Sequence, residues 1–166
     1  MIKTQVIDNW LETELAEYLS NYLLQGINYR AGHQSNVEDN SSFLMGEVPI
    51  TPLVSYLFSK IRNLLPSELL RVYTNLQYKD MGGDFHTDDG DITFLYMSSK
   101  GLNSKEGPFI IKTIPGDKDS PEEKIEYRFN RLIYFNAKQY HKGVAPIQNI
   151  PRITLAFKTK SLLNKL

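Results

Sequence analysis

Three side chains of this 166-residue sequence could bind a metal ion together, and they lie in two separate stretches. His86 and Asp88 stand two residues apart, so both side chains point to the same face of an extended backbone. His141 comes much later and can join them only if a sheet brings its strand alongside. Two imidazoles and one carboxylate on one face of a metal suit non-haem Fe(II), because the opposite face stays open. A His-x-Asp pair alone is more often a surface turn, so the context decides.

Arg152 supplies part of that context. It follows Pro151 and opens a run of β-branched and apolar residues, 152–157, which predicts a strand. An arginine that a strand carries into a pocket can bind a carboxylate through two parallel hydrogen bonds. The alternative is a surface salt bridge on that strand.

Taken in order, these motifs resemble those of the Fe(II)/2-oxoglutarate-dependent dioxygenases, and within them the prolyl-4-hydroxylase-like branch. The resemblance extends over roughly residues 68 to 160, which is far more specific than one His-x-Asp pair. The matching pieces are Tyr78 with Gly82 and Gly83, His86-Thr87-Asp88, 93–97, 106–111, 130–135, 141–146 and Arg152.

The resemblance implies a role for each candidate residue. Fe(II) would be held by His86, Asp88 and His141, and its remaining positions would take 2-oxoglutarate and then dioxygen. Asp89 is not the expected ligand, because it points away from His86 on an extended backbone. The cosubstrate would be bound by Arg152 at its distal carboxylate, by the Tyr78 hydroxyl, and by Leu95 and Met97 as an apolar wall. Tyr78 could equally be an ordinary barrel aromatic, and Leu95 and Met97 could be core residues.

The implied reaction hydroxylates an unactivated C–H bond and converts 2-oxoglutarate and dioxygen to succinate and carbon dioxide. From the branch, the first expectation for the substrate is a prolyl or other residue of a peptide or protein. A free amino acid or small molecule is the alternative, and an alkylated nucleobase comes third. Two other classes stay open: a metal-dependent hydrolase or isomerase on the same barrel, and a catalytically silent binding module.

Composition limits the kinds of binding partner and the cellular compartment that we expect. The net formal charge is zero, so no basic field predicts binding to nucleic acid or to a membrane surface. The chain has no cysteine, which excludes disulfides and thiolate chemistry and agrees with a cytoplasmic location. No apolar run predicts a signal peptide or a membrane span. The sequence does not predict the oligomeric state.

Length and patterning predict a single domain, 1–166, with a helical and irregular part at 1–67 and a β core at 68–160. Asp8 is expected to cap a helix that ends at Gly26, and Thr51 a second helix that ends before Pro66. Short strands are expected at 4–7, 27–29, 42–45, 70–78, 92–97, 109–114 and 124–136, and around His141 and Arg152. This pattern predicts a mainly β barrel or sandwich with flanking helices. The resemblance implies a double-stranded β-helix, or jelly-roll, with two amino-terminal α-helices packed outside.

Two polar segments are expected to form a mobile rim of the metal pocket, because binding residues concentrate on loops carried by a rigid scaffold. They are 33–45 and 80–85, both rich in Gly, Asn, Ser and Asp. The second leads directly into His86. The first could instead be a plain surface connection on the far side of the barrel.

Overall fold

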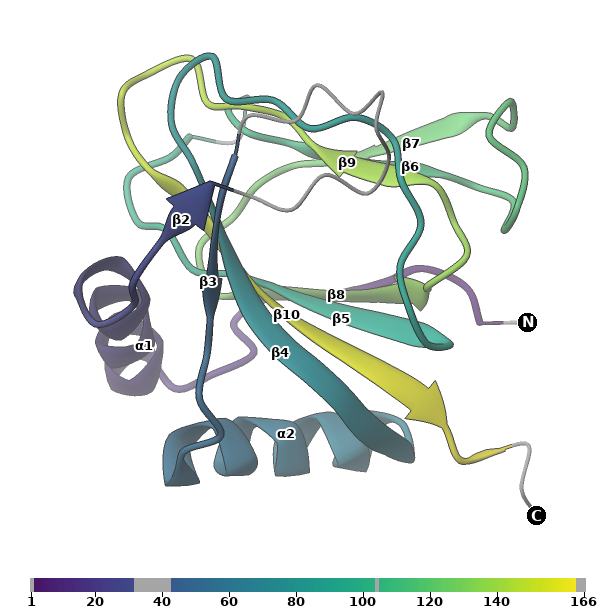
Figure 1. Ribbon diagram of the computed structural model, residues 1–166, viewed down its shortest axis with the longest axis horizontal. Coiled ribbons are helices and arrows are strands. Elements are labelled where there is room, and N and C mark those ends of the chain that lie inside the picture. The colour runs from purple at the N-terminus through teal and green to yellow at the C-terminus, as the bar shows by residue number, and fades with distance from the viewer. Residues whose placement is uncertain (1, 32–42, 104, 164–166) are drawn as a thin grey trace.

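The computed structural model describes residues 2–31, 43–103 and 105–163, which form two helices and ten strands (Figure 1). In chain order these elements are β1 (Gln5–Ile7), α1 (Thr13–Gln25), β2 (Arg30–Ala31), β3 (Leu44–Glu47), α2 (Pro52–Leu64), β4 (Ser67–Gln77), β5 (Ile92–Met97), β6 (Phe109–Lys112), β7 (Glu122–Ile125), β8 (Arg131–Asn136), β9 (His141–Gly143) and β10 (Arg152–Ser161). The expected mainly β class with flanking helices is confirmed.

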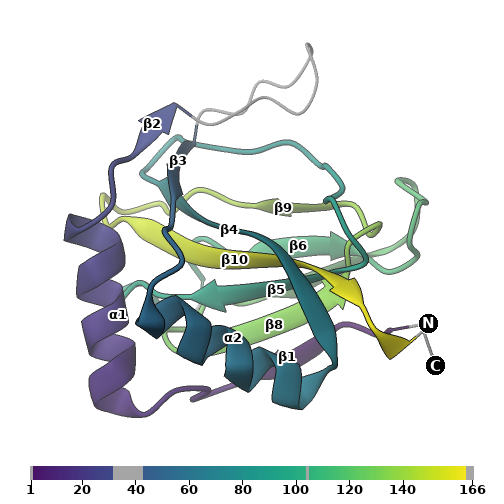
Figure 2. The same cartoon turned by 60° about the horizontal axis from the view of Figure 1, so that its bottom comes forward.

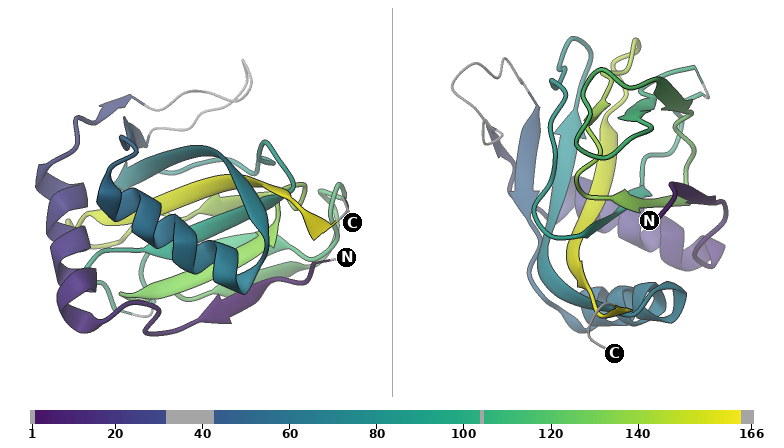
Figure 3. Two further views of the ribbon diagram at one scale, coloured as in Figure 1. Left: turned by 90° about the horizontal axis from the view of Figure 1, so that it is seen from below. Right: turned by 90° about the vertical axis from the view of Figure 1, so that its right-hand side faces the viewer.

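The strands form two antiparallel sheets. The larger sheet has seven strands in the order β1-β8-β5-β10-β4-β3-β2, and the smaller has the order β7-β6-β9. Figure 1 shows the smaller sheet above the larger one, and the side view of Figure 3 shows the same two layers edge on. A backbone bridge between His86 and His141 extends the smaller sheet by one isolated pairing.

Two buried clusters use opposite faces of the larger sheet. One lies between the sheet and the helices and contains Leu19 and Leu57 from the helices with Leu155 from β10. The other lies between the two sheets and includes Phe109 and Phe135. Because side chains alternate along a strand, β10 sends Ile153, Leu155 and Phe157 to the helical side and the intervening residues toward the smaller sheet. The space between the sheets is therefore where functional side chains gather.

The helices support the larger sheet from outside that space. Figure 2 shows α2 lying across the strands of this sheet, with α1 at one end. The amino-terminal end of α2 is as expected: Pro52 opens the helix, and the Thr51 side chain accepts a hydrogen bond from the Val54 amide at 3.3 Å.

The expected start of α1 was wrong. The helix begins at Thr13, after Glu12, and Asp8 lies before it. The Asp8 carboxylate instead accepts hydrogen bonds from the Arg131 guanidinium at 2.6 and 2.9 Å. A charge-assisted pair with a buried arginine outweighs an exposed helix cap.

Strand boundaries follow the sequence patterns with small shifts. β5 spans the expected residues, 92–97. The pairing expected for 27–29 and 42–45 occurs two residues later, with Arg30 opposite Met45. Neither α1 nor α2, the two helices in the part of the chain that the structure describes, is long and apolar enough to cross a membrane.

Candidate metal and cosubstrate site

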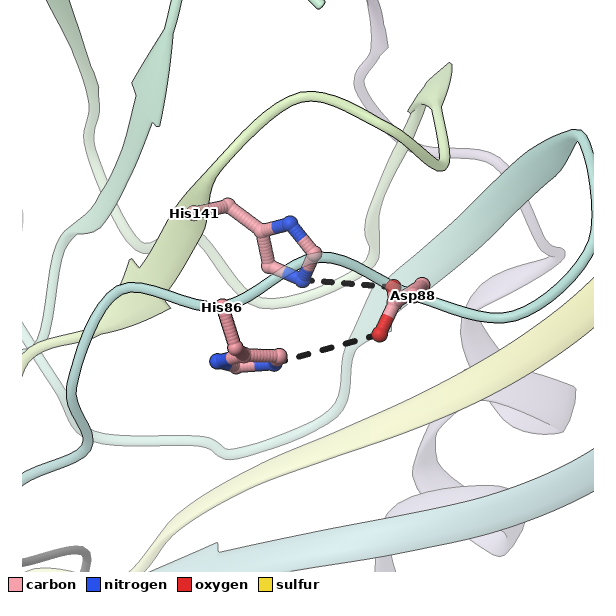
Figure 4. A group of neighbouring side chains, drawn as sticks. All are labelled: His86, Asp88 and His141. Carbon is pink, nitrogen blue, oxygen red and sulfur yellow. Dashed lines mark ion pairs between the residues drawn. The ribbon is translucent and has the colours of Figure 1, made fainter. Parts of the chain in front are cut away.

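His86, Asp88 and His141 meet at one end of the space between the sheets (Figure 4). The backbones of His86 and His141 exchange two hydrogen bonds, of 3.1 and 2.9 Å, which hold the two imidazoles side by side. The Asp88 amide donates to the Ala137 carbonyl at 2.8 Å and so fixes the carboxylate beside them. His86 Nε2 lies 3.8 Å from Asp88 Oδ1, and His141 Nε2 lies 3.2 Å from Asp88 Oδ2.

The three side chains fit a divalent metal. Three ligands on one face of an octahedral ion, with bonds near 2.1 Å, lie about 3 Å apart. The His141–Asp88 distance is close to this value, and all three ligand atoms lie within 4.8 Å of one another. The other imidazole nitrogens bind backbone carbonyls: His86 Nδ1 the Asp84 oxygen at 3.0 Å, and His141 Nδ1 the Gln139 oxygen at 2.8 Å. A carbonyl only accepts, so each Nδ1 carries a proton, and Nε2 is the ring nitrogen that remains to bind a metal.

The local electrostatics favour the protonation states that a metal needs. Burial, together with neighbouring His141, lowers the pKa of His86 and keeps it neutral. Burial alone would raise the pKa of Asp88, but His141 and Lys158 lower it well below its ordinary value. Asp88 is thus ionised, and His86 neutral, at neutral pH.

Arg152 lies at the other end of the same space. It is the first residue of β10, and 2 % of its surface is exposed. Its Nε donates to the Gly107 carbonyl at 2.6 Å and one terminal nitrogen to Gln77 Oε1 at 2.7 Å, while Nη2 is buried without a hydrogen-bond partner among the described residues. Burial lowers the pKa of Arg152 to about 10, which leaves it charged at neutral pH. A buried guanidinium with a free donor is a site that an anion can complete.

Two glycines provide the volume that the guanidinium occupies. A Cβ atom on Gly107, whose φ is +57°, would lie 2.7 Å from Arg152 Cδ. A Cβ atom on Gly143 would lie 2.8 Å from both an Arg152 nitrogen and Gln77 Oε1. Both glycines belong to motifs that carry the family resemblance, so the structure gives those motifs a physical reason.

One cavity, the inner cavity, joins the three candidate ligands to Arg152. Its wall includes Leu95, as expected, and the aromatic rings of Phe109 and Phe135, which lie 5.4 and 4.7 Å from the His141 ring. A second, wider pocket, the outer pocket, adjoins the inner cavity and is lined by His86 and Asp88 but not by His141. The side chains that line both are Phe43, Tyr73, Asn75, His86 and Asp88.

Two expected cosubstrate contacts lie elsewhere in the fold. Tyr78 packs against the cluster on the helical side, and its neighbour Gln77 lines the cavity and binds Arg152. Met97 is fully buried in the cluster between the sheets but does not line the cavity. Asp89 turns to solvent, with 82 % of its side chain exposed.

The expected rim is described in part. In the segment 80–85, Gly83 lines the inner cavity and Phe85 the outer pocket. Residues 33–42 of the other segment lie outside the described part of the chain, whereas Phe43 and Met45 line the outer pocket. The mobility of both segments remains a prediction.

Sequence reasoning missed Lys158, Thr93 and Gln77. Lys158 is 2 % exposed and forms an ion pair with Asp88, and the Thr93 hydroxyl donates to the same carboxylate at 2.7 Å. A signal for Lys158 was present: it has the same strand parity as Arg152, in a run otherwise made of apolar and hydroxyl residues.

Comparisons with known proteins give one clear result, on the fold. No protein-family model and no curated protein sequence matches the chain. Among solved structures, a prolyl hydroxylase from Trichoplax adhaerens, in complex with a peptide of hypoxia inducible factor, superposes with a TM-score of 0.71 at 18% identity. That match covers 94% of this chain and 83% of the other.

Two bacterial structures give similar agreement. HygX from Streptomyces hygroscopicus, with nickel, 2-oxoglutarate and hygromycin B bound, has a TM-score of 0.71 at 11% identity over 97% of this chain and 84% of its own. A Pseudomonas putida prolyl-4-hydroxylase has a TM-score of 0.69 at 13% identity over 96% and 92%. The chain therefore has the fold of the Fe(II)/2-oxoglutarate oxygenases, as the sequence motifs predicted, and a His–Asp–His cluster that can hold a metal.

Proposed function

We propose that this protein is an Fe(II)- and 2-oxoglutarate-dependent dioxygenase that hydroxylates an unactivated C–H bond. One observation carries the proposal: a single cavity has three metal-ligand atoms at one end and a buried arginine with a free donor at the other. A short dicarboxylate with a keto group next to one carboxylate matches both ends. The two sheets would be the halves of a double-stranded β-helix, with both helices outside it.

Each residue would have a distinct task. His86, Asp88 and His141 would hold Fe(II) through Nε2, a carboxylate oxygen and Nε2, and Arg152 would bind the distal carboxylate of 2-oxoglutarate. When bound, the metal and cosubstrate would supply oxidative decarboxylation by dioxygen, which yields succinate and carbon dioxide and hydroxylates the substrate. The apolar wall of Leu95 and the neighbouring phenylalanines would exclude water.

The substrate would enter through the outer pocket, since this pocket reaches solvent and is lined by two of the three candidate ligands, His86 and Asp88. We propose a residue of a peptide or protein as the substrate, and a free amino acid or small molecule as the second candidate. Structures of the same fold support either: one contains a peptide, another hygromycin B. The outer pocket offers rings for contact with a substrate, those of Tyr73, Phe85 and Tyr140.

The test combines binding and turnover. With 2-oxoglutarate present, purified protein should bind one Mn(II), used as an inert substitute for Fe(II), and the His86→Ala/His141→Ala double variant should bind none. With Fe(II), 2-oxoglutarate should be converted to succinate, and a panel of peptides, amino acids and nucleic acids should identify the substrate that accelerates this conversion. Undiminished metal stoichiometry in the double variant contradicts the metal site.

The same experiment separates the competing classes. A hydrolase or isomerase built on this barrel would bind metal but not 2-oxoglutarate, and the free donor of Arg152 argues against it. A catalytically silent module would bind both and produce no succinate. Succinate formation that depends on His86 and His141 therefore distinguishes the proposal from both.

A further inference from the structure

A buried lysine adjoins the candidate metal site, and neither the metal ligands nor the arginine clamp requires it. Lys158 lies on β10 and lines the inner cavity together with Arg152. Its ammonium pairs with Asp88 Oδ2, lies 3.3 Å from the Thr93 hydroxyl and lies 5.3 Å from the centre of the Tyr73 ring. Both members of the ion pair are almost fully buried, at 2 % and 5 % side-chain exposure.

The charged state of Lys158 follows from these neighbours. Burial alone would lower the pKa of Lys158, but the ion pair with the Asp88 carboxylate keeps it above its ordinary value. Burial also raises the pKa of Tyr73, so the phenol stays neutral. The ammonium is therefore a full positive charge at neutral pH, in a place where water screens it little.

A count of formal charges shows what this lysine adds. With the two imidazoles set aside as metal ligands, the charged side chains among the described residues that line the inner cavity are Asp88, Arg152 and Lys158, and their formal charges sum to +1. A divalent metal raises this to +3, and a dicarboxylate returns it to +1. Without Lys158 the fully loaded cavity would be neutral, so the lysine is the surplus charge.

From this geometry we propose that the positive charge of Lys158 weakens binding of the metal and strengthens binding of the dicarboxylate. This inference rests on the proposed function. In the metal-free protein Lys158 neutralises Asp88 and occupies the oxygen that also faces His141. A divalent cation must enter against this charge, and the two charges of 2-oxoglutarate are attracted by it. The metal is then held firmly only when 2-oxoglutarate is present.

A plain positioning role for Lys158 predicts a different result. If the ammonium merely oriented the Asp88 carboxylate, its removal would displace a metal ligand and weaken metal binding. Cosubstrate binding, which follows the metal, would weaken with it. The charge-setting role predicts changes of opposite sign for the two ligands.

The experiment measures two affinities by calorimetry: Mn(II) without 2-oxoglutarate, and 2-oxoglutarate with Mn(II) saturating. In Lys158→Met, which keeps the length of the side chain and removes its charge, Mn(II) should bind about tenfold or more tightly and 2-oxoglutarate about tenfold or more weakly. Lys158→Arg should restore both affinities toward the wild-type values. Lys138→Met is the matched control: its exposed ammonium binds the Asp88 carbonyl at 3.1 Å from outside the cavity, so both affinities should change by less than about twofold.

Each outcome decides the proposal. Weaker Mn(II) binding in Lys158→Met, or no change in either affinity, overturns it, and Lys158→Gln serves as a second uncharged variant if the first does not fold. Tight Mn(II) binding to the wild-type protein without 2-oxoglutarate also overturns it. A wild-type protein that binds neither Mn(II) nor 2-oxoglutarate instead contradicts the proposed function, so the two failures are distinguishable.

Discussion

Two buried arginines, Arg131 and Arg152, stand at the first positions of β8 and β10, and they are satisfied very differently. Arg131 binds the Asp8 carboxylate through Nε at 2.6 Å and Nη2 at 2.9 Å, and its Nη1 donates to the Glu126 carbonyl at 2.8 Å. Every nitrogen of this guanidinium has a partner, and its charge is balanced by a carboxylate.

Arg152 is more deeply buried, and it has neither a full set of hydrogen bonds nor a carboxylate that balances its charge. Its partners are the neutral oxygens of Gly107 and Gln77, and the Tyr127 ring lies 5.2 Å from the guanidinium carbon. In the part of the chain that the structure describes, Nη2 has no hydrogen-bond partner. A buried charge without a counter-ion costs stability, so a fold that retains one does so for another reason. The comparison therefore distinguishes Arg131, whose hydrogen bonds are all made within the protein, from Arg152, whose free donor is available to a ligand.

The largest effect that can test this contrast is on cosubstrate binding. Arg152→Ala should weaken 2-oxoglutarate binding by roughly 2–4 kcal/mol, the scale for removing one partner of a buried, hydrogen-bonded charge pair. Mn(II) affinity should survive, because the three ligands are at the other end of the cavity. Titration of the Mn(II)-loaded variant with 2-oxoglutarate measures this. Arg131→Ala is the control and should keep the wild-type affinity; an unchanged affinity in Arg152→Ala would count against the clamp.

A smaller effect should follow from crowding the clamp without removing it. In Gly143→Ala the added methyl would lie 2.8 Å from both Arg152 and Gln77, and overpacking of this kind costs about 1–3 kcal/mol. We expect 2-oxoglutarate affinity to fall by part of that amount, with Mn(II) binding retained. Gly82→Ala is the matched control, since a Cβ atom there meets nothing within 4 Å. Equal affinities in the two variants would mean that the guanidinium is not held where the structure places it.

The two arginines also show which parts of the site could be predicted from the sequence. Metal-ligand types and spacing selected His86, Asp88 and His141, because two-residue spacing on extended backbone is a local property. Arg152 was selected for its strand and for the family resemblance. The partners of Arg152 were not found, since Gln77 and Gly107 come from other strands and loops whose register no local pattern specifies.

Where the structure differs from the local sequence patterns, contacts between distant parts of the chain are again the cause. Asp8 has the local signature of a helix cap, but a long-range pair with Arg131 takes its carboxylate. Tyr78 was selected by motif, yet a one-residue difference in strand parity places Gln77 on the cavity side and Tyr78 against the helical cluster. Lys158 was missed because a lysine late in an apolar strand has no motif of its own. Local chemistry was predictable, and pairings across the sheets were not.

The smallest expected effect is a loss of stability when the ion pair between Asp8 and Arg131 is removed. The Arg131 hydrogen bonds lower the pKa of Asp8 in the folded protein, more than its burial raises it. A lowered folded-state pKa stabilises the fold above the unfolded-state value of 3.8, and this stabilisation is lost as the pH falls through the folded-state pKa. Because 35% of the Asp8 side chain is exposed, we expect Asp8→Asn to lose only about 1 kcal/mol of unfolding free energy at neutral pH. Chemical denaturation should show that the difference in unfolding free energy between wild type and Asp8→Asn becomes smaller between about pH 5 and pH 3. The affinity for 2-oxoglutarate at neutral pH should stay at the wild-type value. A difference in unfolding free energy that does not depend on pH would show that Asp8 acts through packing. A loss of 2-oxoglutarate affinity in Asp8→Asn would remove the distinction between the two arginines.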